Sequence, residues 1–131
     1  MELQKLEHIN INVSDLSASV NFYKDVLGMK LGERPQFKSK GAWLYLGDTA
    51  VIHLTHGRCE AQVGSGTLDH LAFRASDLSG FTETLKNKNI DFEERRVPEQ
   101  QQHQIFFDDP DGITIEVVFE TASDLSNLET R

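Results

Sequence analysis

The chain contains the same motif twice. Residues 6–17 (LEHININVSDLS) recur as residues 68–79 (LDHLAFRASDLS), and His8 and His70 occupy the same position in the two copies. Such self-similarity indicates a duplicated structural unit. A unit of about sixty residues is too short to bury a large, stable hydrophobic core by itself. The sequence therefore predicts two equivalent modules, each with a histidine on its first strand. Each module must pack against another folded unit to be stable.

A second pair of equivalent positions lies on the last strand expected in each module. Residues 50–55 (AVIHLT) align with residues 113–118 (ITIEVV), at an offset one residue longer because of the turn at residues 108–112. His53 and Glu116 then occupy the same position. Histidine nitrogen and glutamate oxygen both bind divalent metals. The repeat thus relates four candidate metal ligands: His8, His53, His70 and Glu116.

Each module is expected to have the element order β-α-β-β-β. Alternation of apolar and polar residues over residues 9–13 predicts a strand. Asp15 and Asp77 precede apolar stripes of helical spacing, and Gly28 follows the first of them, so two capped helices are expected. Extended segments follow the helices at residues 29–33, 42–46 and 50–54 and at residues 91–94, 104–107 and 113–119. Polar connections at residues 34–40 and 98–103 are expected to be longer and to contact ligands.

The strand alternation assigns the candidate ligands to one face. If Ile52 and Leu54 belong to the core, His53 points to the opposite, concave face, and the same reasoning applies to Glu116. Polar groups buried there need partners, so this face is expected to bind a small molecule. Each residue also has a plain structural alternative, since Glu116 could pair with an arginine and an aromatic could belong to the core. The candidate substrate-binding residues are Asn10, Arg74, Trp43 and, as an acid or base at the rim, His103.

Composition narrows the class of protein. The chain has 21 acidic and 13 basic residues, a net charge of −8 and no basic cluster longer than two arginines, which argues against a nucleic-acid surface. No apolar run approaches the roughly eighteen residues that span a bilayer, and the first residues do not resemble a signal peptide, so a cytoplasmic protein is expected. Cys59 is the only cysteine, which excludes an intrachain disulfide and a thiolate metal cluster.

Several motifs together resemble a known superfamily. Residues 6–9, 22–29 (FYKDVLGM), 68–71 and 107–112 (FDDPDG), followed by Glu116, are similar to the vicinal oxygen chelate superfamily, which comprises glyoxalases, bleomycin resistance proteins and extradiol dioxygenases. The resemblance covers residues 5–120. It implies an α+β fold of two tandem βαβββ modules forming a curved mixed sheet. We expect a single domain over residues 1–131, with module 1 at 5–60, module 2 at 66–120 and a short C-terminal helix or tail at 122–131.

The resemblance also implies a metal and a reaction. In that superfamily a divalent ion is bound at the positions of His8, His70 and Glu116, whereas the position of His53 varies by branch and is a glutamate in bacterial glyoxalase I. This implies a glyoxalase I-like lyase or isomerase that acts on a small α-oxygenated substrate through a metal-stabilised enolate, with Glu116 and His53 as catalytic residues. The ion could be Zn, Ni, Co, Mn or Fe. A homodimer is implied, with sites that could be shared between chains.

Three alternatives stay open. The same triad could hold Fe(II) or Mn(II) in an extradiol-type dioxygenase, with His53 as acid–base catalyst. A bleomycin-resistance-type protein would bind its ligand without a metal, but such proteins generally lack the ligand set present here. A fosfomycin-modifying transferase would be expected to carry a Ser-Gly-Asp-type potassium-binding stretch, which residues 99–104 do not contain.

Overall fold

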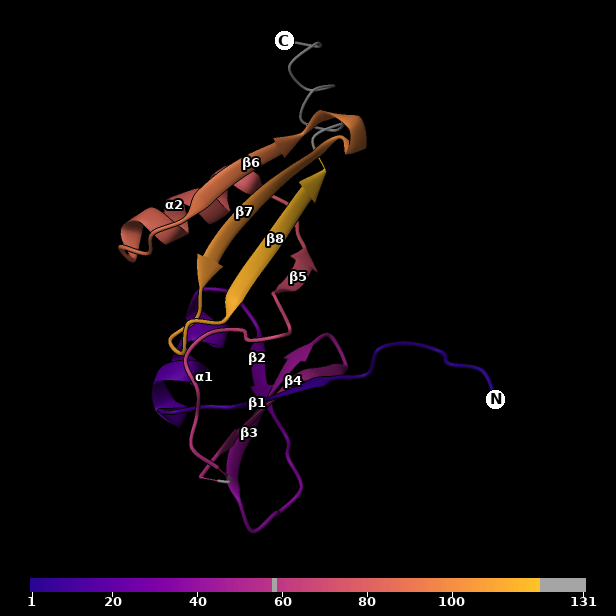
Figure 1. Cartoon of the computed structure of the whole chain (residues 1–131), viewed down its shortest axis with the longest axis vertical. Helices are drawn as coiled ribbons and strands as arrows, with labels where there is room; N and C mark the ends of the chain where they lie inside the picture. The colour runs from indigo at the N-terminus through magenta and orange to yellow at the C-terminus, as the bar shows by residue number, and fades with distance from the viewer. Residues whose placement is uncertain (58, 121–131) are drawn as a thin grey trace. The chain divides into compact units, whose positions relative to one another are not determined.

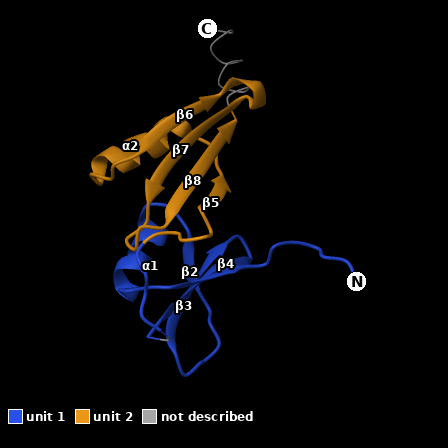
Figure 2. Cartoon of the chain, in the orientation of Figure 1, with its two compact units in different colours: residues 1–63 blue, residues 64–131 orange. Residues whose placement is uncertain are grey.

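The computed structural model of the chain describes residues 1–57 and 59–120 (Figure 1). It divides into two compact units, unit 1 (Met1–Val63) and unit 2 (Gly64–Arg131), coloured separately in Figure 2. Each unit contains one β-α-β-β-β set with its own four-stranded mixed sheet. The predicted tandem βαβββ fold is therefore confirmed. The helix or tail expected at residues 122–131 lies outside the described residues, and a single domain over residues 1–131 stays a prediction.

Unit 1 follows the predicted element order. Its sheet has the strand order β1-β4-β3-β2, in which β1 runs parallel to β4 and the other neighbours are antiparallel. The elements are β1 (Ile9–Asn12), α1 (Leu16–Asp25), β2 (Lys30–Gly32), β3 (Lys40–Leu46) and β4 (Thr49–His56).

Unit 2 repeats this topology with the strand order β5-β8-β7-β6. Its elements are β5 (Leu71–Arg74), α2 (Leu78–Asn87), β6 (Glu93–Val97), the short 3₁₀ helix η1 (Pro98–Gln100), β7 (Gln102–Asp108) and β8 (Thr114–Glu120). The long polar loop expected at residues 98–103 is instead a tight connection, because η1 and a left-handed Gln101 (φ 52°) turn the chain directly into β7. Strand β7 consequently begins inside the segment assigned to the loop, and β6 continues three residues beyond its expected end at residue 94.

Both helices begin where the sequence signals predict, and Gly28 follows the end of α1 as expected. The Asp15 side chain accepts a hydrogen bond from the Ala18 amide, and Asp77 accepts one from the Gly80 amide, both at 3.1 Å. After α1, Gly28 adopts a φ of +70°, a conformation that is inexpensive only for glycine. No helix in the described part of the chain is long and apolar enough to cross a membrane.

One face of each sheet is covered by the helix of the same unit. In unit 1, α1 packs on β3 and β4, and Tyr23, Leu44 and Leu54 are fully buried. In unit 2, Phe81 of α2 contacts Phe107 and Phe119, with ring centroids 5.5 and 5.9 Å apart. The strand alternation thus assigned the core face correctly, and the residues between the core positions lie on the opposite face of each sheet.

Candidate functional site

Strand register places the repeat-related residues in equivalent positions. In unit 1, His53 pairs with Asn10 on β1 and with Trp43 on β3. In unit 2, Glu116 pairs with Ala72 on β5 and with Phe106 on β7. In both units the two partners lie at equivalent positions of the first and third strands. His53 and Glu116 are therefore structural counterparts, as the sequence alignment predicted.

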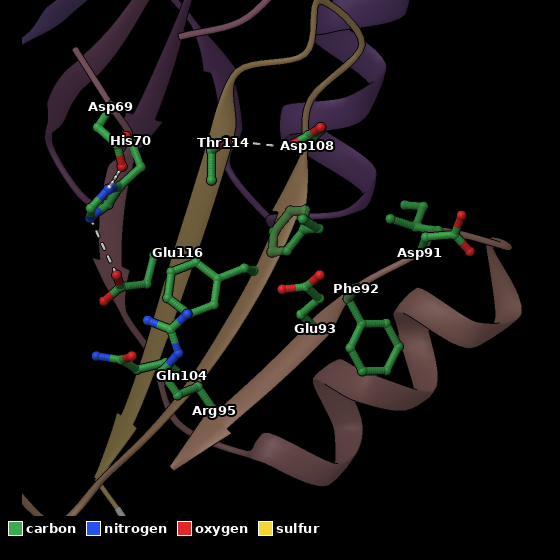
Figure 3. Close-up of a pocket in the computed structure, with 13 residues that line it drawn as sticks. Asp69, His70, Asp91, Phe92, Glu93, Arg95, Gln104, Asp108, Thr114 and Glu116 are labelled. Carbon is green, nitrogen blue, oxygen red and sulfur yellow. Dashed lines mark hydrogen bonds and ion pairs between the residues drawn. The ribbon is translucent and has the colours of Figure 1, made fainter. Parts of the chain in front are cut away.

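A cavity of about 810 Å³ opens on the polar face of the unit 2 sheet (Figure 3). Strands β6, β7 and β8 contribute Arg95, Gln104 and Glu116 to its wall, and His70 approaches from the segment before β5. The guanidinium of Arg95 lies over the Phe106 ring, 5.1 Å from its centroid. The cavity therefore combines an apolar ring surface with acidic and basic groups, a combination that suits a small polar ligand.

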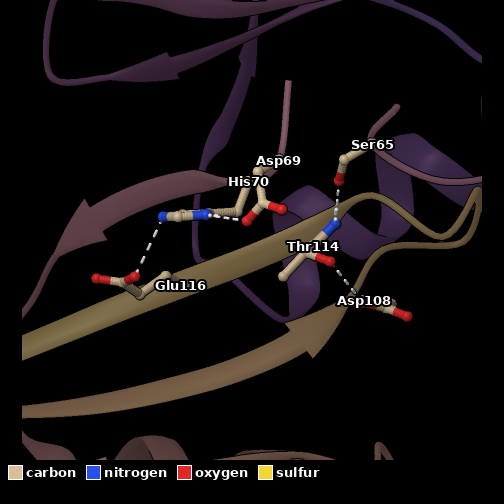
Figure 4. A network of polar contacts seen from close by, with 6 residues as sticks. All are labelled: Ser65, Asp69, His70, Asp108, Thr114 and Glu116. Carbon is tan, nitrogen blue, oxygen red and sulfur yellow. Dashed lines mark hydrogen bonds and ion pairs between the residues drawn. The ribbon is translucent and has the colours of Figure 1, made fainter. Parts of the chain in front are cut away.

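His70 and Glu116 contact one another at this cavity (Figure 4). His70 Nε2 lies 3.3 Å from Glu116 Oε1, and His70 Nδ1 lies 2.7 Å from Asp69 Oδ2. The Glu116 side chain is only 12% exposed. When Nδ1 donates its proton to Asp69, the Nε2 lone pair faces a carboxylate, so the pair is stabilised only by a positive species, a proton or a metal cation. A carboxylate that contacts one ring nitrogen of a histidine, and so orients the other nitrogen, is typical of metal-binding histidines.

The strand that carries Glu116 is anchored at its start. The Thr114 amide donates to Ser65 Oγ at 2.9 Å, and the Thr114 hydroxyl donates to Asp108 Oδ1 at 3.3 Å (Figure 4). These bonds fix the first residue of β8, two positions before Glu116. The carboxylate is therefore held on a defined strand rather than on a loop.

Unit 1 repeats the carboxylate–histidine contact. His8 Nδ1 lies 3.2 Å from Glu7 Oε1, in the same relation as His70 and Asp69. The partner of His8 differs, because its ring stacks on His53 with centroids 3.8 Å apart and planes inclined by 9°. His53 in turn stacks on Trp43, with centroids 3.9 Å apart and planes inclined by 13°.

The environment of His53 favours the neutral imidazole. Its pKa is lowered, first by burial and second by the neighbouring His8 ring, and a backbone hydrogen bond at Ala50 and the Glu7 carboxylate oppose this only partly. A neutral imidazole is the form that can bind a metal or accept a proton. His53 is thus suited to either of the roles that the sequence left open.

The predicted substrate-binding residues have different surroundings. Asn10 lies on the same face as His53, and its amide donates to Thr55 Oγ1 at 3.0 Å. Trp43 is also on this face, stacked on His53, so it is not a core residue. Arg74 lies on the polar face of unit 2, but its partner is Glu120, at 2.7 Å, rather than Glu116.

His103 is not at the rim of the cavity. It alternates along β7 with Ile105 and Phe107, all three are buried, and the cavity-facing residues of that strand are Gln104 and Phe106. Its Nε2 lies 3.3 Å from a Glu94 carboxylate oxygen. The prediction failed because the strand begins earlier than expected. Extending the alternation of residues 104–107 back to residue 102 would have put His103 on the core face.

Sequence reasoning missed three groups that contribute to the site. Glu7 and Asp69 orient the histidines, and their signal was present, because an acidic residue precedes the histidine in both copies. Arg95 reaches the cavity only through the pairing of β6 with β7, in which it faces Gln104. That register has no signal in a single sequence, since β6 was expected to end at residue 94.

The residues present fit a divalent cation. Each unit by itself carries two of the four candidate ligands, and no group of three or more histidine, cysteine or acidic side chains close enough to hold an ion occurs among residues 1–57 and 59–120. The donors are imidazole nitrogen and carboxylate oxygen, and the carboxylates beside His8 and His70 orient their rings. The chemistry of the donor set and the Nε2–carboxylate contact both favour a metal.

A known protein family matches most of the chain. The family model described as the glyoxalase/bleomycin resistance protein/dioxygenase superfamily matches residues 5–117. The chain belongs to this superfamily. Among curated superfamily proteins, it is 30% identical over 125 residues to Glyoxylase I 4 of Arabidopsis thaliana (89% of this chain and 71% of the relative), and 32% identical over 125 residues to the lactoylglutathione lyase of Shigella flexneri (88% and 93%). It is also 30% identical over 129 residues to the metallothiol transferase FosB of Staphylococcus saprophyticus (93% and 81%).

Solved structures of superfamily members share the fold. A glyoxylase/bleomycin resistance protein/dioxygenase domain from Frankia superposes with a TM-score of 0.76 at 24% identity, covering 91% of this chain and 93% of that one. The fosfomycin resistance protein FosX from Listeria monocytogenes, in a structure complexed with Mn(II) and 1S,2S-dihydroxypropylphosphonic acid, gives a TM-score of 0.73 at 20% identity and covers 95% and 98%. The relatives thus share one fold but differ in reaction.

Proposed function

We propose that the protein is a divalent-metal-dependent enzyme of the superfamily that acts on a small α-oxygenated molecule as a glyoxalase I-like lyase or isomerase. His8, His70 and Glu116 are its metal ligands, and His53 is either a fourth ligand or an acid–base group. The observation that carries the proposal is the Asp69–His70–Glu116 arrangement, in which an oriented histidine nitrogen faces a nearly buried carboxylate. The Glu7–His8 contact repeats its first half.

The residues divide the chemistry between them. A bound divalent ion would act as a Lewis acid and spread the negative charge that develops on adjacent substrate oxygens. Glu116, in a partly buried position, would take a proton from the carbon beside the substrate carbonyl and return it to the neighbouring carbon, so that the reaction is an isomerisation with no net loss of atoms. The ring face of Phe106 and the Arg95 guanidinium would hold the rest of the substrate in the cavity.

The relatives support a metal enzyme. Lactoylglutathione lyases are about as similar to this chain as the transferase FosB, and FosX was solved with Mn(II). Zn, Ni, Co, Mn and Fe all suit nitrogen and oxygen ligands of this kind. We further expect a cytoplasmic homodimer, the arrangement implied by the family.

Thiol transfer is the second candidate function. It is favoured by the match to the metallothiol transferase FosB, which covers 93% of this chain. A transferase of this kind would be expected to have a potassium-binding loop at residues 99–104. The tight η1 connection between β6 and β7 occupies that segment, so this candidate has less support from the chain's own residues. An extradiol-type dioxygenase is the third, and a neutral His53 would suit its acid–base step.

Metal content tests the proposal first. Untagged wild-type protein, His70→Ala and Glu116→Gln are compared by inductively coupled plasma mass spectrometry after reconstitution, with His56→Gln as the matched control. His56 is the last residue of β4 and contacts only the Val13 carbonyl, at 3.0 Å, among the contacts described for it. Near-stoichiometric metal in wild type and control, lost in the other two variants, is expected. Metal-free wild type would leave a binding protein.

The identity of the metal and turnover then separate the enzyme classes. Ni, Co or Zn with isomerisation of a hemithioacetal supports the lyase. Transfer of a thiol to an epoxide in the presence of Mn supports the transferase, and Fe with ring cleavage of a catechol supports the dioxygenase. Full metal loading without any of these reactions would contradict the substrate assignment but not the metal site.

A further inference from the structure

Three aromatic rings are stacked in a row on the polar face of unit 1. Trp43 on β3, His53 on β4 and His8 just before β1 lie one above another, with centroid separations of 3.9 and 3.8 Å and nearly parallel planes. Phe37 extends the row at 6.4 Å from Trp43, in a tilted orientation. His53 is the middle ring and has an aromatic neighbour on each face.

This stack is incompatible with both histidines binding the same ion. An imidazole nitrogen directs its lone pair in the plane of the ring, and zinc and related ions bind it at about 2.0–2.1 Å. With the two rings nearly parallel and their centroids 3.8 Å apart, an ion in the plane of His8 lies well outside the plane of His53. One of the two rings must turn away before either can join a shared centre, or one of them must not be a ligand.

The structure indicates which ring can turn. Trp43 and His53 are registered partners on adjacent, hydrogen-bonded strands in the interior of the sheet. His8 precedes β1 by one residue, its side chain is 37% exposed, and its one other described contact is Glu7. Rotation of His8 breaks one ring contact and no strand pairing, whereas rotation of His53 breaks two ring contacts.

The equivalent position in unit 2 shows the contrast. Phe106 occupies the position of Trp43 and Glu116 that of His53. Phe106 contacts the edge of His70, with centroids 6.4 Å apart and planes at 80°, and Glu116 keeps a carboxylate oxygen directed at His70. Phe106 therefore leaves the Glu116 carboxylate uncovered in unit 2, whereas Trp43 covers one face of the His53 ring in unit 1.

We propose that Trp43 is a positioning residue that keeps His53 out of the metal coordination sphere, and that His8 leaves the stack when it binds the ion. The inference rests on the proposed metal function and decides between the two roles that it left to His53. The centre then has three protein ligands, His8, His70 and Glu116, and keeps positions open for substrate oxygens. His53 remains uncoordinated, and the ring nitrogen that is not hydrogen-bonded at Ala50 is available for proton transfer.

Nitrogen-15 NMR of protein labelled at histidine, with and without one equivalent of Zn(II), tests this directly. The expected result is a metal-bound nitrogen shift for His8 and His70 only, with signals assigned by single His→Gln variants. A metal-bound shift at His53 would overturn the inference and leave the metal function intact. Failure of the wild type to bind Zn(II), Ni(II) or Co(II) would overturn both, so the two failures are distinguishable.

Zinc affinity gives a second readout that does not depend on catalysis. Competition with a chelating dye should show His53→Gln close to wild type, whereas His70→Gln weakens binding by more than about tenfold, since a lost ligand costs at least as much as a lost outer-shell partner. An equal loss in the two variants would make His53 a ligand and overturn the inference.

Substitutions of Trp43 test its positioning role. Trp43→Leu removes the ring under His53 and should allow His53 to bind, so a third metal-bound histidine signal is expected. Trp43→Phe, the matched control, keeps a ring and should retain two. A folded Trp43→Leu variant that still shows two bound histidines would contradict the positioning role. If that variant does not fold, the wild-type spectrum still decides whether His53 is bound.

Discussion

His70, the residue before β5, has its Nε2 3.3 Å from Oε1 of Glu116 on the neighbouring strand β8. Because Asp69 holds the opposite nitrogen of His70 at 2.7 Å, the contact joins a lone pair to a carboxylate unless a proton or a metal cation lies between them. This relationship is the main structural reason for expecting a metal. It also determines which substitutions should be informative.

Glu116→Gln should abolish stoichiometric metal binding while the fold is kept. The amide has the size and shape of the carboxylate but no charge, so packing is kept, and circular dichroism and the melting temperature should change little. Glu120→Gln is the control, because Glu120 is exposed and pairs with Arg74. Unchanged metal content in Glu116→Gln would remove Glu116 from the site.

Asp69→Asn should weaken metal binding without removing a ligand. Carboxylates that orient a metal-binding histidine typically contribute about 10–100-fold in affinity. Glu7→Gln should have a smaller effect, because the Glu7–His8 contact is longer, at 3.2 Å. Isothermal titration with Zn(II) measures both, and Asp48→Asn in the β3–β4 turn is the control. An affinity for Asp69→Asn equal to that of the wild type would contradict the orienting role.

The metal-free protein should lose stability in mildly acidic solution partly through His53. The pKa of His53 is lowered by burial and by His8, so below about 6.5, the pKa of a free imidazole, the unfolded chain binds this proton before the folded chain does. This proton therefore destabilises the folded protein increasingly as the pH falls through that range, and it has no effect above it. The melting temperature between pH 7.5 and 5 should therefore fall less in His53→Gln than in wild type. A steeper fall of the melting temperature in His53→Gln would contradict a lowered pKa of His53.

His103→Phe should be neutral or slightly stabilising and should leave metal binding unchanged. His103 is buried on the core face of β7, and neither ring nitrogen makes a hydrogen bond within the described residues, since the 3.3 Å contact of Nε2 with the Glu94 carboxylate is an ion-pair contact only. An apolar ring of similar size removes polar groups whose burial costs about 1–3 kcal/mol each when they are unpaired. Urea unfolding measures the change. Loss of metal or of turnover in a stable His103→Phe protein would restore a role at the site.

Mixing two inactive variants determines whether one chain supplies all the ligands. His8→Ala and His70→Ala each remove one ligand. In a dimer whose sites are shared between chains, a mixed dimer regains one intact site, so co-refolding should restore metal to about a quarter of the wild-type content if half of the dimers are mixed. Sites formed within one chain should show no recovery. Metal content of the refolded mixture, with each variant refolded alone as control, is the measurement.

The internal repeat predicted much of this structure. Alternating residues within strands identified the core face, and the aligned copies paired His53 with Glu116 before any strand register was known. The helix starts at Asp15 and Asp77 followed from local capping chemistry. Each of these features depends on neighbours in the sequence, which is why the sequence alone was sufficient.

The exact strand ends were harder to predict. The tight connection at η1 lengthened β6 and β7, brought Arg95 to the cavity and put His103 in the core. A turn of this kind depends on the pairing of two strands, for which residues 98–103 carry no distinct signal. The wrong prediction for this loop therefore put His103 on the wrong face of the sheet and left Arg95 out of the predicted site.

The sequence by itself determined the two βαβββ units, their core faces and the four residues with metal-binding chemistry, because periodicity, capping and repetition are local properties of the chain. Only the tertiary structure decided which atoms face each other. It directed His70 Nε2 at Glu116 and stacked His53 between His8 and Trp43, although the repeat made the two positions equivalent. Side-chain contacts between strands depend on the size and shape of the residues that pairing brings together, and that information appears only when the sheet has formed.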